Sequence, residues 1–261
     1  MHTPFKHDGP DISIIVPCLN EEQNIPILLQ KLMAVVESES LSAEILIVDD
    51  CSDDYTFRAA FLLQSSDSRV RALHKGLPRG IGHAIRFGID HAHGRVGVVA
   101  MGDCVDPLAA IPDFHRKIVE EGNHLVLLSR YIDHEDSRNI PFSYRFYQWW
   151  YRHLARLFVG MPFRDITYAF RGFDLAFIRN VGLNSGGFEI SPEITFKIWL
   201  ANGKVCELKG RQGRRFSGES KFFMSKEGYG YARVLLGAAI TRLVHSITPS
   251  RKKRWAKPMQ G

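Results

Sequence analysis

Short apolar segments that alternate with helix-like segments constrain this chain more than any other feature. The segments with the composition of buried β-strands are residues 12–16, 45–48, 70–74 and 96–100. Segments with a helical pattern follow the first three of them, at residues 25–37, 56–64 and 80–91. Strands and helices that alternate in this way predict an α/β fold, with a mostly parallel, doubly wound sheet and helices on both faces.

Two of the predicted strands end at carboxylates. The second runs into Asp49 and Asp50, and the fourth runs through Met101 and Gly102 to Asp103 and Asp106. Open α/β sheets bind their ligands at the C-terminal ends of the strands. We therefore expect Asp103, with Asp106 as a helper, to hold a divalent cation, Mg²⁺ or Mn²⁺, against a diphosphate. The alternative is a turn closed by Asp103 and a helix N-cap at Asp106.

Cysteines and glycine motifs argue against several classes of protein. The four cysteines are far apart and form no CxxC pair, so neither a zinc site nor a disulfide framework is indicated, and a reducing cytosol suits the chain. The chain has no GxGxxG and no GxxxxGK[ST] motif, which argues against a dinucleotide dehydrogenase and a P-loop NTPase. Residues 1–10 are polar and no apolar run reaches spanning length, so we expect neither a signal peptide nor a membrane-spanning helix.

The net charge of +6 is partly concentrated in residues 251–257. Such a run suits anionic lipid or nucleic acid, and a solvated, disordered tail is the alternative. Because a nucleic-acid role rests on charge alone, we expect no nucleic-acid partner.

An ordered series of motifs resembles family 2 glycosyltransferases of the GT-A fold. The first motifs are IIVPCLNEE at 14–22, IVDDCSDDYT at 47–56, GIGHA at 80–84, and MGDCVDP at 101–107, which stands where the family has its DxD metal motif. The later motifs are SRY at 129–131, DITYAFR at 165–171, GFE at 187–189 and RFSGESK at 215–221. They are similar to the branch that acts on polyprenyl phosphates, typified by dolichol-phosphate mannosyltransferase. The resemblance covers roughly residues 11–225, and the ordered series is more specific than any single motif.

The resemblance implies an inverting glycosyltransferase with a nucleotide-sugar donor. The residues that it places around the donor are Pro17, Asn20, Glu21, Asp50, Gly80, Gly82, Asp103, Arg130 and Arg171. Pro17, Asn20 and Glu21 would line the nucleoside pocket, and Asp50 would contact the base or ribose, whose N–H and hydroxyl groups carboxylates accept from. For Asp50, a turn or N-cap position is the alternative.

The metal motif departs from the family pattern. Its usual first acid falls on Met101, so Asp103 is the second acid, and Asp106 stands where some relatives carry Asp or Asn. With one acid missing, we expect weaker metal affinity unless Asp106 supplies a ligand directly or through water.

The expected catalytic residues are Asp103, Asp165, Arg215 and Lys221. Four basic residues suit a donor diphosphate and an acceptor phosphate, although each alone also fits a surface charge: Arg130, Arg171, Arg215 and Lys221. A sugar-hydroxyl acceptor needs a general base, for which Asp165 or Glu189 is available. A phosphate acceptor is already anionic and needs none. Asp165 would then orient an arginine or a donor hydroxyl, or cap the local backbone before Thr167.

Two helical segments bear on the acceptor. Residues 144–159 mix Trp and Tyr with Arg, as interfacial helices do, and a core-packing helix with its arginines in water is the alternative. Residues 233–247 are also amphipathic and, with the basic tail, would seat the protein on anionic lipid. The expected organisation is a tail at 1–10, a GT-A domain at 11–225, an amphipathic helix at 226–248 and a disordered basic tail at 249–261.

We therefore predict a peripheral enzyme on the cytoplasmic face of a membrane. It would transfer mannose or glucose, from GDP-mannose or UDP-glucose, to a polyprenyl phosphate, as a homodimer or with a membrane-anchored partner. One alternative is a glycosyltransferase with a saccharide hydroxyl acceptor. Another, suggested by Met101, is an inactive nucleotide-sugar-binding or membrane-scaffold protein.

Overall fold

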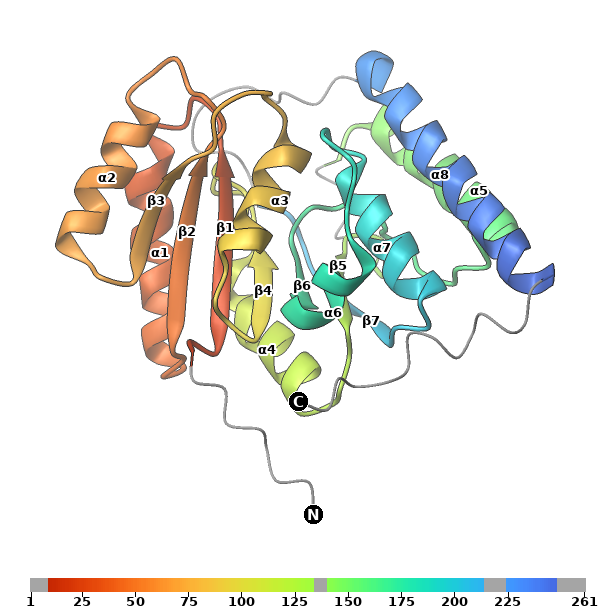
Figure 1. The fold of residues 1–261 in the computed structure, drawn as a ribbon, viewed down its shortest axis with the longest axis horizontal. Helices are drawn as coiled ribbons and strands as arrows, with labels where there is room; N and C mark the ends of the chain where they lie inside the picture. The colour runs from red at the N-terminus through yellow and green to blue at the C-terminus, as the bar shows by residue number, and fades with distance from the viewer. Residues whose placement is uncertain (1–8, 134–139, 214–223, 248–261) are drawn as a thin grey trace.

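The fold is built on a mixed, mostly parallel sheet. The structure, a computed structural model, describes residues 9–133, 140–213 and 224–247. In this part of the chain seven strands form one sheet in the order β3-β2-β1-β4-β6-β5-β7 (Figure 1). They are β1 (Ile12–Cys18), β2 (Ala43–Asp49), β3 (Val70–His74), β4 (Val96–Val99), β5 (Leu125–Ser129), β6 (Arg171–Asp174) and β7 (Val205–Lys209). Strand β6 runs antiparallel to both of its neighbours, and the other pairs are parallel.

Helices cover both faces of this sheet. They are α1 (Asn24–Ser38), α2 (Thr56–Ser66), α3 (Ile81–His91), α4 (Ile111–Val119), α5 (Phe142–Val159), α6 (Leu175–Val181), α7 (Ile190–Leu200) and α8 (Met224–Ile247), with a short 3₁₀ helix at Leu108–Ala110. The predicted α/β fold is confirmed. The elements expected between residues 12 and 100 lie within a few residues of their predicted bounds.

The alternation of side chains along β1 explains the continuous apolar composition of the strands. Ile14 and Val16 pack with α1 and α4 on one face, and Ile15 packs with α3 on the other. A strand buried on both faces needs apolar side chains at every position, which is the usual state of parallel sheets under two helical layers.

Helices α5 and α8 lie side by side at the end of the molecule remote from β3 (Figure 1). Each buries a narrow stripe. The buried side chains are Tyr151, Ala155 and Val159 of α5 and Tyr231, Leu235 and Ala238 of α8. Many large apolar side chains of both helices stay exposed, so core packing accounts for only part of the α5 composition. None of the described helices is long and apolar enough to cross a membrane.

Most of the predicted tails, and the motif at 215–221, lie outside the described residues. Helix α8 begins at Met224, close to the expected start of the C-terminal helix, and it packs on α5 and α7. The predicted division of the chain into domains stays a prediction.

Candidate active site

A pocket of about 290 Å³ lies at the C-terminal ends of β1, β2 and β4. We call it the strand-end pocket. It is lined by Pro17, Cys18, Leu19, Glu21, Asp50, Arg79, Gly80, Ile81, Ala84, Met101, Gly102, Asp103 and Phe188. Five of the residues predicted to surround the donor, Pro17, Glu21, Asp50, Gly80 and Asp103, are therefore brought together, at the edge where open α/β sheets bind ligands.

Asp50 fixes the loop that leads into α3. One carboxylate oxygen accepts a hydrogen bond from the backbone N–H of Gly80 at 2.6 Å, and the other is 2.7 Å from the Lys75 ammonium. Both side chains are almost fully buried. Asp50 thus borders the pocket and also holds its rim in place through the residue 75–80 loop.

Gly80 and Gly82 bring two backbone segments into contact. The Gly82 N–H donates to the Gly186 carbonyl at 2.9 Å, and a Cβ on Gly82 would lie 2.6 Å from the Ser185 carbonyl oxygen. Gly80 has φ +146°, and a Cβ there would overlap the Gly186 carbonyl. A side chain at either position is therefore excluded by backbone. Gly82 itself lies outside the lining of the pocket. It holds the segment that places Phe188 against the pocket.

The two acids after β4 point to different places. Asp103 is 5% exposed and lines the pocket. Cys104, at φ +61°, turns the chain, and Asp106 lies outside the pocket lining. There one Asp106 oxygen accepts from the Met101 N–H and the other from the Tyr168 hydroxyl, both at 2.7 Å. Burial raises the pKa of Asp106 to about 7.

The contacts of Asp106 do not place it at the pocket, and its predicted contact with a metal stays a prediction. Its two oxygens are engaged by the protein, and it does not line the pocket. The alternative N-cap is also absent, because the 3₁₀ helix that follows has no side-chain cap. Asp106 instead shapes the loop that presents Asp103.

The position of Asp103 suits a divalent cation that binds together with the phosphates of a substrate. The described residues contain no group of three or more His, Cys, Asp or Glu side chains suited to hold a metal ion. Mg²⁺ is often bound by one or two carboxylates together with substrate phosphates. The Asp103 carboxylate, together with the phosphates of a bound diphosphate, would supply that donor set.

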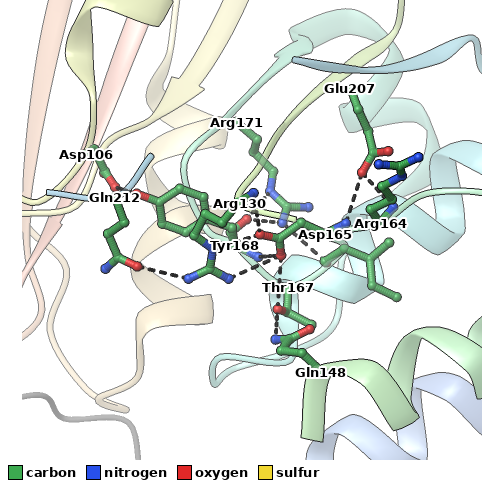
Figure 2. Close-up of polar contacts among 11 residues, drawn as sticks. Asp106, Arg130, Gln148, Arg164, Asp165, Thr167, Tyr168, Arg171, Glu207 and Gln212 are labelled. Carbon is green, nitrogen blue, oxygen red and sulfur yellow. Dashed lines mark hydrogen bonds and ion pairs between the residues drawn. The ribbon is translucent and has the colours of Figure 1, made fainter. Parts of the chain in front are cut away.

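A buried network links this loop to the residues that follow β5 (Figure 2). The Arg130 Nε lies 2.7 Å from an Asp165 oxygen, and Asp165 is fully buried. The same carboxylate accepts from the N–H groups of Arg130 and Tyr168. Arg130 also lies over the Tyr168 ring, 4.1 Å from its centroid, and that hydroxyl binds Asp106. Burial alone would lower the pKa of Arg130, but the Asp165 charge raises it.

Arg130 and Arg171, both expected to contact the donor, lie outside the lining of the strand-end pocket. Arg171 is 1% exposed, and its guanidinium donates to the Tyr168 and Ser191 carbonyls and to the Thr195 hydroxyl. Burial lowers the pKa of Arg171 to about 10. The Arg171 guanidinium thus ties β6 to α7, and its predicted contact with the donor stays a prediction.

Asn20 and Glu189 also have structural partners. The Asn20 side chain accepts from the Asp53 N–H at 2.8 Å and so joins the first two strand-end loops, outside the pocket lining. Glu189 is buried and lies 3.2 Å from the Arg233 guanidinium. Asp165 and Glu189, the two carboxylates expected as a base, are each paired with an arginine. Neither of them lines the pocket.

Arg79 and Phe188 line the pocket but were not predicted as site residues. Arg79 pairs with Asp53 at 2.5 Å. It directly precedes Gly80, and this position next to a predicted site loop could have identified it from the sequence. Phe188 lies within the GFE motif. Arg215 and Lys221 fall outside the described residues. The described chain before them ends at Gly213, whose N–H donates to the Val105 carbonyl at 2.8 Å.

Comparison with known proteins gives a family match and several relatives. Residues 13–181 match the family described as Glycosyl transferase family 2. The chain is 27% identical to a dolichol-phosphate mannosyltransferase of Mycosarcoma maydis, over 81% of this chain and 74% of that protein. It is also 27% identical to an undecaprenyl-phosphate mannosyltransferase of Micrococcus luteus, over 79% of this chain and 85% of that protein.

The fold is similar to that of a solved glycosyltransferase. Glucosyl-3-phosphoglycerate synthase from Mycobacterium tuberculosis, crystallised with Mn²⁺, UDP and phosphoglyceric acid, superposes with a TM-score of 0.64. The alignment covers 90% of this chain and 78% of that chain, at 16% identity. At this identity the similarity concerns the fold.

Proposed function

The chain belongs to glycosyl transferase family 2, and on that premise we propose that it transfers a sugar from a nucleotide-sugar donor to a polyprenyl phosphate. It is a glycosyltransferase with the GT-A fold that its motifs implied. The named relatives act on dolichol phosphate and undecaprenyl phosphate, which supports this class of acceptor.

The proposal rests on the partners of the Asp165 carboxylate. A hydroxyl nucleophile must lose its proton to a base within hydrogen-bond reach. Asp165 gives its oxygens to Arg130 and to neighbouring N–H groups, and Glu189 is paired with Arg233. A phosphate acceptor needs no such base, because its oxygen is already charged. In the proposed reaction this oxygen bonds to the anomeric carbon as the nucleoside diphosphate leaves from the opposite side.

The strand-end pocket is the proposed donor site. Glu21 and Asp50 offer carboxylate oxygens to the nucleoside, and Asp103 faces the diphosphate. Arg215 and Lys221 are proposed to neutralise the phosphates, because they follow the anchored Gly213 closely in the chain. Asp165 orients Arg130 rather than taking a proton.

A divalent cation, Mg²⁺ or Mn²⁺, is the proposed cofactor. It would offset the negative charge that grows on the leaving diphosphate. Asp103 is its proposed protein ligand, and a structurally similar enzyme was crystallised with Mn²⁺ and UDP.

The proposed location of the enzyme is the cytoplasmic face of a membrane. The exposed aromatic side chains of α5 and apolar side chains of α8 support this location, since such faces favour the membrane interface. The proposed partners are an anionic lipid surface and, in addition, either a second copy of the chain or a membrane-anchored protein.

The test is transfer of radiolabel from GDP-mannose and UDP-glucose, with Mg²⁺ or Mn²⁺, to a polyprenyl phosphate in detergent. We expect one of these donors to give label that extracts into organic solvent. Label that appears only in a water-soluble saccharide would instead support the hydroxyl-acceptor reaction. Binding of donor without transfer to any acceptor would contradict the proposal.

A further inference from the structure

Helix α8 reaches the strand-end pocket through one of the residues that line it, Phe188. This residue belongs to the segment 185–189, which leads into α7. Helix α8 begins at the end of the molecule where β1 and β2 have their C-terminal ends, and it packs on α7 (Figure 1). The proposed reaction gives no role to the first turns of α8. Their contacts with the segment 185–189 indicate one.

The first turns of α8 bind both polar backbone groups of Phe188. The Glu227 carboxylate accepts a hydrogen bond from the Phe188 N–H. The Tyr231 hydroxyl donates to the Phe188 carbonyl oxygen at 3.4 Å. Residues four apart lie on the same face of a helix, which explains how Glu227 and Tyr231 reach the same residue. Helix α8 therefore fixes the backbone from which the Phe188 side chain enters the pocket lining.

The neighbours of Phe188 are also held closely by α8. Glu189 is buried, and its carboxylate lies 3.2 Å from the Arg233 guanidinium. A Cβ on Gly230 would lie 2.9 Å from the Glu189 carboxyl carbon, so the helix approaches this side chain closely. A Cβ on Gly187 would lie 2.5 Å from a Glu189 oxygen and 3.2 Å from a Glu227 oxygen. Both carboxylates therefore lie against the Gly187 backbone.

Helix α3 fixes the same segment through its own first turn. The Gly82 and His83 N–H groups both donate to the Gly186 carbonyl, at 2.9 and 3.3 Å. A Cβ on Gly186 would overlap the His83 ring, so this ring also packs on the segment. The segment 185–189 therefore contacts the start of α3 and the start of α8. A shift of Phe188 requires that one of these two sets of contacts yields.

We propose that Glu227 and Tyr231 are positioning residues, which hold the Phe188 side chain in the wall of the strand-end pocket and so set the affinity for the donor. Phe188 lines the pocket together with the apolar residues Ile81 and Ala84. An aromatic ring offers a large contact area, so a displaced Phe188 would lose contact with a bound nucleotide sugar. The proposal rests on the proposed function for the identity of the ligand, and the contact itself is tested without ligand.

The first measurement is amide hydrogen exchange at Phe188 in the full chain without ligand. Glu227→Leu removes the acceptor of the Phe188 N–H, whereas Glu227→Gln keeps a carbonyl oxygen in its place. We expect exchange at Phe188 to be about 10-fold faster in Glu227→Leu and within about 2-fold of the wild-type rate in Glu227→Gln. This rescue by the conservative variant assigns the effect to the hydrogen bond rather than to the size of the side chain.

The second measurement is calorimetric titration with GDP-mannose and with UDP-glucose, in Mn²⁺ and without acceptor. For the donor that the wild type binds more tightly, Kd should rise by about 10-fold in Glu227→Leu and stay within about 2-fold in Glu227→Gln. Tyr231→Phe removes a hydroxyl but keeps the buried ring, and it should raise Kd by about 3- to 10-fold.

Tyr229→Phe is the matched control for Tyr231→Phe. It removes a hydroxyl from the same helix, at a side chain that is 80% exposed, and it should leave the donor Kd unchanged. A role in folding alone would lower the stability of Glu227→Leu and Tyr231→Phe without changing the Kd measured well below their unfolding temperatures. The donor Kd therefore distinguishes positioning of Phe188 from general support of the fold.

Three results would overturn the proposal. The first is a donor Kd within about 2-fold of the wild type in both Glu227→Leu and Tyr231→Phe. The second is unchanged exchange at Phe188 in Glu227→Leu. The third is an equal loss of affinity in Tyr229→Phe, which would indicate general loosening of α8. A wild type that binds neither donor would contradict the proposed function, and exchange at Phe188 would then decide alone whether α8 holds the pocket wall.

Discussion

The strand-end pocket and the Arg130–Asp165 network both gather charged residues from predicted motifs, yet they use them differently. In the pocket, Asp103 and Glu21 line a cavity that a ligand can enter. In the network, Asp165 and Arg130 are engaged with each other, and Arg171 nearby is engaged with backbone carbonyls. Both regions lie at strand ends, and they are joined through Tyr168 and Asp106.

The difference shows that the charged residues of predicted motifs can have two roles: some contact the substrate, and others hold the loops in place. Charged side chains without a cavity beside them hold loops at fixed positions, and those loops present the few charges that meet the substrate. Removing a network residue should therefore reduce stability first, and removing a pocket residue should reduce transfer first. The predictions below test this division.

The largest expected effect is on the network. Asp165→Ala leaves the buried Arg130 guanidinium without its carboxylate, and we expect the free energy of unfolding to fall by about 3–5 kcal/mol. Denaturant unfolding measures it. The control Asp133→Ala, at a partly exposed pair with Lys209, should change it by less than about 1 kcal/mol. Equal losses in both variants would show that Asp165 has no special structural role.

The next effect is in the strand-end pocket. Asp103→Asn keeps the shape of the side chain but removes its charge, and we expect transfer to fall by about 100-fold, equivalent to about 3 kcal/mol of cation and diphosphate stabilisation. Steady-state rates across a Mn²⁺ titration measure it. Asp106→Asn should leave the half-saturating Mn²⁺ concentration unchanged. A shift in that concentration for Asp106→Asn would restore Asp106 as a metal ligand.

A smaller effect is expected where the two backbone segments meet beside the pocket. Gly82→Ala would drive a Cβ against the Ser185 carbonyl, so we expect a loss of about 1–3 kcal/mol in stability and weaker donor binding through displaced Phe188. Gly237→Ala is the matched control, because no atom lies within 4 Å of its Cβ. Within helix α8 it should instead stabilise by about 1 kcal/mol. Unchanged donor affinity in Gly82→Ala would show that this contact does not shape the pocket.

The smallest effect is a pH dependence at Asp106. The pKa of Asp106 is raised to about 7 in the folded chain. Between about pH 4 and pH 7 the folded chain therefore keeps a proton on Asp106 that the unfolded chain has released. The contribution of Asp106 to stability therefore falls as pH rises from about 4 to about 7. Asp106→Asn removes this dependence, so the stability of the variant relative to wild type should rise by about 1–2 kcal/mol between pH 5 and pH 7. A pH-independent difference would place the pKa of Asp106 near its ordinary value.

Sequence patterns predicted the frame of the fold and part of the site. Apolar strands that end in polar residues placed Pro17, Asp50 and Asp103 correctly at one edge, because parallel strands bring their C-terminal ends together. Spacing could not distinguish Asp103 from Asp106. The direction in which each carboxylate points depends on the positive φ of Cys104. Cysteine has no preference for that conformation, so the residue type did not indicate the turn.

The remaining differences have similar causes. The motif containing Arg171 indicated a charged residue near the site, but its burial follows from the packing of β6 on α7. Gly82 was expected to lie around the donor, whereas its small size serves a contact with a segment about 100 residues later in the chain. Contacts of such long range are not encoded in local pattern.

The most direct test of the central claim compares two acceptors that differ by one group, a polyprenyl phosphate and the matching polyprenol. Transfer of radiolabelled sugar to each is measured with the wild-type chain under the same detergent and cation conditions. Because neither Asp165 nor Glu189 is placed to take a proton, we expect transfer to the phosphate and none to the alcohol. Transfer to the polyprenol at a comparable rate would contradict the account, since it would require a base that these paired carboxylates do not provide.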